Sequence, residues 1–237
     1  ICFFLLGRRN LDAFYFPILY AEDGSLISLT YGYGYLEGFW NITFNRHLPA
    51  AGSAIILTLS RLVNSLLFGS NISNLPEIVS IVSNIMFAAT VASPLLFLGK
   101  IYDRSSLIIL TLSLVLIPVG SNYNEIFGRA LNFSFWTPIA AIALSLRFYH
   151  WPPKSYFSVL FYSIMFSLLS LIFIVNIVAP LAIICVLGMR SIYARNFQAF
   201  VAPSFVAFIL IVALSLSVLN GDFDANGGAP EAVFVQE

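Results

Sequence analysis

Charged side chains are scarce in this chain. Only 9% of its 237 residues are Asp, Glu, Lys or Arg, and 59% are hydrophobic, whereas soluble domains carry about a quarter charged residues. Basic and acidic residues balance at 11 each, so the sequence offers no basic surface for a nucleic acid. The composition therefore argues against an ordinary soluble domain and predicts an integral membrane protein surrounded by membrane lipids, with no nucleic-acid partner.

Cysteine and histidine are also rare. Cys2 and Cys185 both lie in apolar runs, which argues against a disulfide framework or a zinc site and predicts packing roles. His47 and His150 are far apart in the sequence, so histidine ligation of a metal is not expected. The chain begins with Ile1, and "ICFFLLG" is shorter than the roughly 20 apolar residues of a span. We expect the sequence to be part of a longer protein.

Apolar blocks bounded by Gly, Pro and charge predict an all-α fold, a polytopic membrane helical bundle forming a single transmembrane domain. The blocks cover residues 50–69, 76–99, 106–120, 131–148, 156–188 and 198–219. Asn176 and Pro180 interrupt the block 156–188, which is too long for one span, so a broken helix pair is expected there. We expect the acidic tail 220–237 to be flexible.

The block 50–69 allows two interpretations because Arg61 lies near its middle, where a charge costs about 2.5–3.5 kcal/mol on insertion scales. Arg61 belongs to a polar stripe at helical spacing, opposite a leucine stripe. The polar stripe contains Thr58, Ser60, Arg61, Asn64 and Ser65, and the leucines are Leu57, Leu59, Leu62, Leu66 and Leu67. This pattern predicts a juxtamembrane helix in the interface, or a spanning helix that turns its polar face into a bundle.

Cationic residues in short loops predict which ends of the helices face the cytoplasm. Three loops carry them: Lys100 and Arg104, Arg147 and Lys154, and Arg190 and Arg195. The loop 121–132 then faces outside. The segment 8–49 is external and interfacial if 50–69 lies in the interface, but cytoplasmic, with Arg8, Arg9 and Arg46, if 50–69 spans.

Two adjacent carboxylates, Glu22 and Asp23, stand out in the aromatic stretch "YAEDGSL". In a catalytic interpretation, either acid acts as a general base toward a hydroxyl acceptor, or Asp23 binds a divalent cation, Mg²⁺ or Mn²⁺, that holds a phosphate. Arg46 and His47 would then neutralise a phosphate leaving group. The structural alternative is a turn, with Gly24 supplying backbone freedom and the acids favouring a helix N-terminus.

Three stretches resemble bacterial multi-pass membrane glycosyltransferases of the GT-C superfamily, in particular an uncharacterised branch with an "AEDG" first external loop. The stretches are "FYFPILYAEDGSLISLTYGYG" at 14–34, "NEIFGRALNFSFWTPIAAIAL" at 124–144 and "LSLIFIVNIVAPLAII" at 169–184. Members of this superfamily are longer than this chain, and their first loop carries juxtamembrane helices. The resemblance therefore favours the external position of 8–49.

The resemblance implies transfer of a sugar from a polyprenyl-phosphate donor at the external face of a bacterial inner membrane, with Asp23 or Glu22 as the acid. Candidate contacts to the donor or acceptor come from several parts of the chain. They are Arg46, His47, Arg61, Glu125, Arg129 and Trp136, with a sugar or lipid surface at Tyr31 to Tyr35. Glu125 and Arg129 are alternatively an ion pair in a solvated loop, and Trp136 a membrane anchor.

Two other functions remain open from the sequence. A non-catalytic transmembrane subunit of a larger membrane complex would fit the shortness of the chain and its apolar helices, which can pack against partners. A lipid or small-solute carrier would fit the broken helix at Asn176 and Pro180.

Overall fold

The computed structural model describes residues 1–9, 21–44, 51–69, 71–116, 131–151, 155–193, 201, 204–209, 211–212 and 215. Within these ranges all regular structure is helical, which confirms the predicted all-α class. The helices are α1 (Cys2–Arg9), α3 (Ala21–Tyr33), α4 (Tyr35–Phe44), α5 (Ala51–Phe68), α6 (Leu75–Leu98), α7 (Arg104–Leu116), α9 (Thr137–His150), α10 (Tyr156–Ile172) and α11 (Val178–Tyr193). Short 3₁₀ segments precede α6, α9 and α11: η1 (Ile72–Asn74), η2 (Leu131–Trp136) and η3 (Ile174–Ile177). The tail 220–237 lies outside the described residues.

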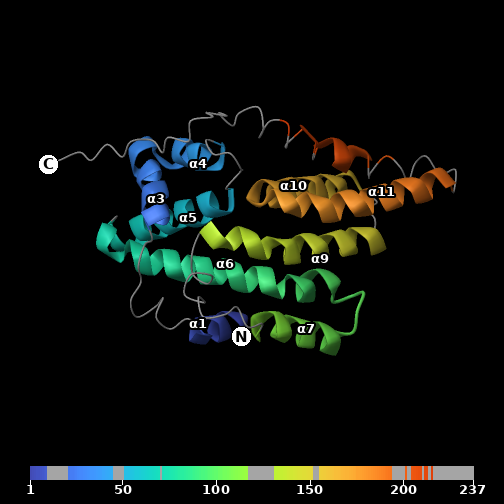
Figure 1. Ribbon diagram of the computed structural model, residues 1–237, viewed down its shortest axis with the longest axis horizontal. Helices are drawn as coiled ribbons and strands as arrows, with labels where there is room; N and C mark the ends of the chain where they lie inside the picture. The colour runs from blue at the N-terminus through green and yellow to red at the C-terminus, as the bar shows by residue number, and fades with distance from the viewer. Residues whose placement is uncertain are drawn as a thin grey trace.

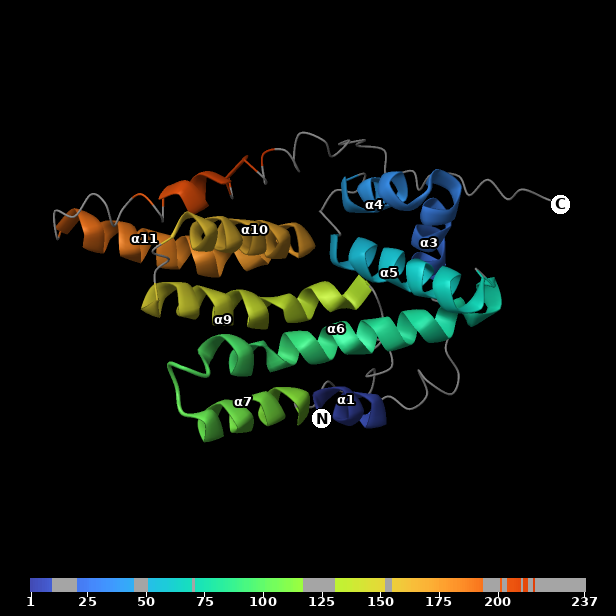
Figure 2. The ribbon, with the colours of Figure 1, turned by 180° about the vertical axis from the view of Figure 1, so that it is seen from behind.

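The long helices lie side by side in stacked rows, with α6 between α7 and α9 (Figure 1). The view from behind shows the same order (Figure 2). Helix α6 contacts α1, α5, α7 and α9, so it is the centre of the bundle. Its Phe87 is fully buried and belongs to a hydrophobic cluster with residues of α1, α3, α4, α5 and η2. A second cluster around Phe148 and Phe166 joins α9, α10 and α11.

Two helical runs in the described part of the chain, α5 and η1 with α6, are long and apolar enough to cross a membrane by length and composition. Helices α7, α10 and α11 are apolar but shorter. The sequence predicted further spans, and two of those blocks extend past the described residues: 106–120 continues beyond Leu116, and 198–219 is described only in part.

Helices α5 and α6 bury polar residues and expose aliphatic ones. On α5, Ser60 and Asn64 are 0% exposed, whereas Leu66 and Leu67 are 75% and 68% exposed. On α6, Ser80, Ser83 and Asn84 are buried while Ile81, Ile85 and Leu96 are exposed. A helix on the surface of a water-soluble protein has the opposite arrangement. The polar stripe around Arg61 therefore faces the bundle.

Leu57 departs from this pattern, because it is fully buried although the sequence put it on the leucine stripe. The N-terminal half of α5 is enclosed by α6, η2 and α10. A Cβ atom on Gly52 would lie 2.9 Å from a side-chain atom of Ile172 and 3.0 Å from Ser134. Residues 51–54, 56 and 57 of α5 are all buried, so both faces of the helix are covered there and polarity does not decide burial.

The predicted break in block 156–188 separates α10 from α11 at η3. Asn176, which is buried there, donates from Nδ2 to the Thr137 hydroxyl at 2.6 Å and to the Leu169 carbonyl at 2.8 Å. Thr137 in turn donates to the Ser134 carbonyl at 2.7 Å. Pro180 lies in the first turn of α11, where a missing N–H costs no helical hydrogen bond. Asn176 thus connects the break to the start of α9.

We expect Asn176→Ala to lower the free energy of unfolding by about 1–2 kcal/mol, because it removes one buried and one partly buried hydrogen bond. Denaturant titration of the purified protein in detergent measures this loss. Asn74→Ala is the matched control, since the Asn74 side chain makes no capping hydrogen bond. Equal losses in the two variants would contradict the role of Asn176.

Candidate functional site

Helices α3 and α4 form a hairpin that depends on two glycines of "YGYGYLEGFW". Gly34, at the junction, has a φ of +84°, a conformation that side chains with a Cβ rarely adopt. A Cβ atom on Gly38 would lie 2.6 Å from Thr30 Cα and 3.0 Å from the Leu29 carbonyl oxygen. Gly34 therefore permits the turn, and Gly38 permits α4 to approach the backbone of α3.

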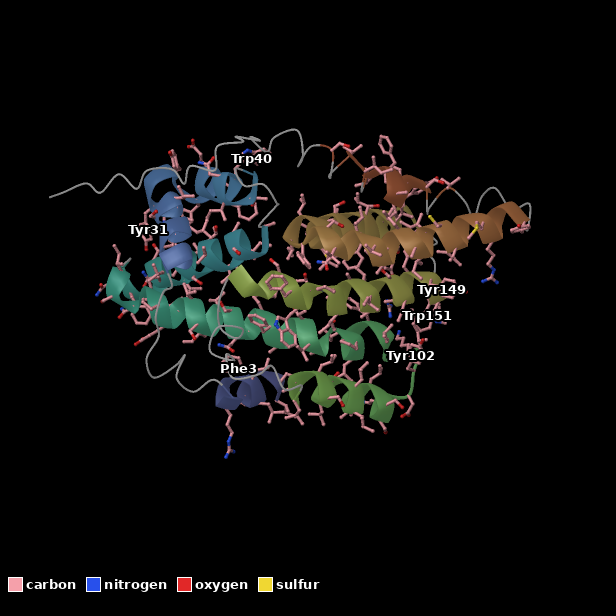
Figure 3. The ribbon with its side chains drawn as sticks, viewed as in Figure 1. Phe3, Tyr31, Trp40, Tyr102, Tyr149 and Trp151 are labelled. Atoms are coloured by element: carbon pink, nitrogen blue, oxygen red, sulfur yellow. The ribbon has the colours of Figure 1, made fainter. Side chains whose placement is uncertain are left out.

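Arg61 of α5 holds this hairpin against the bundle. Its Nη1 donates to the carbonyl oxygen of Thr30. Its guanidinium carbon lies 4.5 Å from the ring centroid of Tyr31 and 4.0 Å from that of Tyr35. Tyr31 is labelled on α3, which runs across the direction of α5 (Figure 3). One side chain of α5 thus contacts both helices of the hairpin.

The end of α3 is a favourable place for this cation. Thr30 lies in the last turn of α3, where carbonyl groups lack helical partners and the helix dipole is negative. The rings of Tyr31 and Tyr35 add cation–π attraction, worth about 0.5–2 kcal/mol each. Among the described residues no carboxylate pairs with Arg61, so carbonyl oxygen and ring faces compensate its charge. These contacts explain why a charge is retained in the middle of an apolar helix.

The acidic pair belongs to α3 as well. Glu22 and Asp23 lie in its first turn, and Gly24 continues the helix. The interpretation of this stretch as a turn is therefore wrong, whereas acids in the first turn suit the positive end of a helix dipole. At 1.5 Å per residue, position 23 lies about 10 Å along the axis from Thr30 and on the same helical face. The side chains of both acids lie outside the described part.

The other predicted contacts fall into two groups. Four of them lie outside the described residues: Arg46 and His47 in the segment 45–50, and Glu125 and Arg129 in the segment 117–130. Trp136 is described: it is half-buried, and its ring packs edge to face against Phe87 at 6.0 Å between centroids. In the described ranges no group of three or more His, Cys, Asp or Glu side chains gathers as metal ligands would. The structure thus brings Arg61 together with Tyr31 and Tyr35 from the predicted set.

A second arginine has a similar arrangement, which the sequence reasoning missed. Arg147 of α9 donates from Nη1 to the Phe97 carbonyl at 3.1 Å, in the last turn of α6. Its guanidinium carbon lies 5.2 Å from the ring centroid of Trp151. The spacing of four residues between Arg147 and Trp151 was a signal available in the sequence. No signal in the sequence indicated the carbonyl partner of either arginine, because that partner lies on another helix.

Comparison of the chain with models of protein families, with curated proteins and with solved structures gives no match.

Proposed function

We propose that this is a multi-pass protein of a bacterial inner membrane, with the aliphatic faces of its helices in contact with lipid. The supporting observation is the burial of Ser60, Asn64 and Ser83 under exposed leucines and isoleucines on α5 and α6. In a bilayer, a polar side chain is more stable against other helices than against lipid, whereas an aliphatic side chain can face lipid without a free-energy cost.

The orientation follows from the cations. Lys100, Arg104 and Arg147 lie near the ends of α6, α7 and α9 that adjoin one another, and such residues favour the cytoplasmic side. Helix α5, which contacts both helices of the α3–α4 hairpin, lies toward the opposite end together with the N-terminal end of α6 (Figure 1). In this orientation the hairpin is at the external face, and α5 lies in the membrane interface rather than crossing the membrane.

We propose further that the protein transfers a sugar from a polyprenyl-phosphate donor at that face, as the resemblance to GT-C glycosyltransferases implies. Glu22 or Asp23 would take the proton from the acceptor hydroxyl or hold a divalent cation against the phosphate. The observation that supports a chemical role is that both acids belong to a helix which is itself fastened to the bundle. Catalytic groups must be held in place to be effective.

In this proposal Arg61 is a positioning residue, because its guanidinium is already engaged by Thr30, Tyr31 and Tyr35. Phosphate contacts would then come from Arg46, His47 or Arg129, and Glu125 would be a further polar contact to the donor or acceptor. Trp136, packed on Phe87, would have a packing role rather than stack on the sugar.

The test is turnover of a lipid-linked sugar by the purified protein, with Mg²⁺ or Mn²⁺ present and absent. We expect Asp23→Asn or Glu22→Gln to abolish turnover while the protein remains folded by circular dichroism. Glu37→Gln is the matched control, since Glu37 is an exposed acid in the first turn of α4. Equal turnover in all variants would overturn the role of the acids. Absence of turnover in the wild type would favour the non-catalytic subunit.

A further inference from the structure

The cationic end of the bundle has an exposed surface that the proposed sugar transfer does not use. Residues 99–103 connect α6 to α7 closely: the amides of Ile101 and Tyr102 donate to the Leu98 carbonyl at 2.8 and 3.0 Å. Lys100 lies within this connection and Arg104 directly follows it, and both are exposed. The turn therefore presents two cations from a fixed backbone.

Aromatic rings from α9 lie beside the same turn. The Tyr102 ring packs edge to face on the His150 ring at 6.2 Å between centroids, and His150 packs on Tyr149 at 5.2 Å. Figure 3 shows Tyr102, Tyr149 and Trp151 together at this end of the bundle. Tyr102 and Trp151 are exposed. Exposed Tyr and Trp at the ends of membrane helices are typical of the headgroup level.

The local charge is positive and not neutralised within the described residues. Asp103 is the acid nearest in sequence, and its carboxylate accepts a hydrogen bond from the Ser106 amide at 3.1 Å at the start of α7. Arg147 is engaged by the Phe97 carbonyl and Trp151. For Lys100 and Arg104 no ion pair with a described side chain is found, so both remain available to an anion from outside.

An apolar surface continues from these cations along the helices. On α7, Ile108 and Ile109 are exposed one turn beyond Arg104, and on α6 Leu96 is exposed one turn before Lys100. A ligand that fits this surface has a negative headgroup and a hydrocarbon chain. Basic sites between helix ends on the cytoplasmic side have the chemistry that anionic lipid headgroups require.

We infer that the surface formed by Lys100, Arg104, Tyr102 and Trp151 binds the phosphate of an anionic phospholipid of the cytoplasmic leaflet. The inference rests on the proposed membrane location, but not on sugar transfer. Each cation near an anionic membrane surface contributes about 1 kcal/mol. Loss of both Lys100 and Arg104 is therefore expected to weaken binding about 20- to 30-fold.

The experiment measures retention of phosphatidylglycerol and of phosphatidylcholine by the purified full chain in detergent, using native mass spectrometry across a lipid titration. We expect the wild type to prefer phosphatidylglycerol, and the double variant Lys100→Gln/Arg104→Gln to lose that preference. Arg190→Gln is the matched control, because Arg190 is an exposed cation in the last turn of α11. Glycerol 3-phosphate, the soluble headgroup, should not displace the lipid at equal concentration.

Three outcomes would overturn the inference. They are equal retention of the two lipids by the wild type, unchanged preference in the double variant, and an equal loss in Arg190→Gln. Displacement by glycerol 3-phosphate would replace the lipid with a soluble phosphate ligand.

If the protein were monodisperse in buffer without detergent, the proposed membrane location would fail together with this site. A protein that requires detergent but does not distinguish the lipids would refute this site alone.

Discussion

Replacing Arg61 with Leu is expected to release the α3–α4 hairpin from α5. The variant loses a hydrogen bond from a charged donor, worth about 1.5–3 kcal/mol, and the cation–π contacts with Tyr31 and Tyr35. Part of this loss is offset because the leucine variant does not pay the free-energy cost of removing a charged guanidinium from water. We expect the free energy of opening of the hairpin to fall by about 3 kcal/mol, which corresponds to roughly 100-fold faster amide exchange.

Hydrogen exchange of the amides in 25–44, followed by mass spectrometry, measures this release directly. Arg61→Lys should give an intermediate rate, because an ammonium group reaches one carbonyl but does not stack as a planar guanidinium does. Arg190→Leu, at an exposed position, should leave the rate unchanged. If 25–44 stays as protected in Arg61→Leu as in the wild type, the hairpin is held by other contacts.

The same variant separates positioning from phosphate binding in the proposed reaction. A positioning residue acts through α3, so Arg61→Leu should reduce turnover in parallel with the loss of amide protection. A phosphate ligand would instead raise the KM for the lipid-linked donor while the amides of 25–44 remained protected. Comparing the two measurements on one preparation therefore decides between the roles.

Gly38→Ala is expected to lower the free energy of unfolding by about 2–3 kcal/mol. The new Cβ atom would lie 2.6 Å from Thr30 Cα, and the nearest neighbours are backbone atoms that cannot turn aside as a side chain can. Helix α4 must therefore move away from α3, and overpacking of this kind costs about 1–3 kcal/mol. The movement also shifts Tyr35, one of the two rings on Arg61. Denaturant titration in detergent measures the change.

Gly32→Ala is the control for this substitution. Gly32 lies in α3, and a Cβ atom there would have no heavy atom within 4 Å apart from its chain neighbours and the nearby backbone of its own helix. Alanine favours a helix over glycine by about 0.5–1 kcal/mol, so this variant should be slightly more stable than the wild type. A gain in stability from Gly38→Ala as well would show that α4 does not need its close approach to α3.

Some features of the site could be read from the sequence and others could not. The stripe of Ser60, Arg61 and Asn64 was visible because helical periodicity is a local property. The sequence did not show whether that stripe faced water or other helices, since both arrangements have the same period. The acids of α3 were visible as residue types, but the continuous helix through Gly24 was not, because isolated glycines are compatible with turns and helices alike.

The sequence by itself determined that the described chain is helical and that the apolar block 156–188 is interrupted. It also showed the few positions at which a charged residue lies in an apolar stretch. Only the tertiary structure decided what those charges do. Arg61 and Arg147 each meet a carbonyl at the end of a different helix, 31 and 50 residues away in the sequence. Helix ends leave carbonyl groups without partners, but which cation reaches them depends on how the helices pack, and no local pattern encodes that.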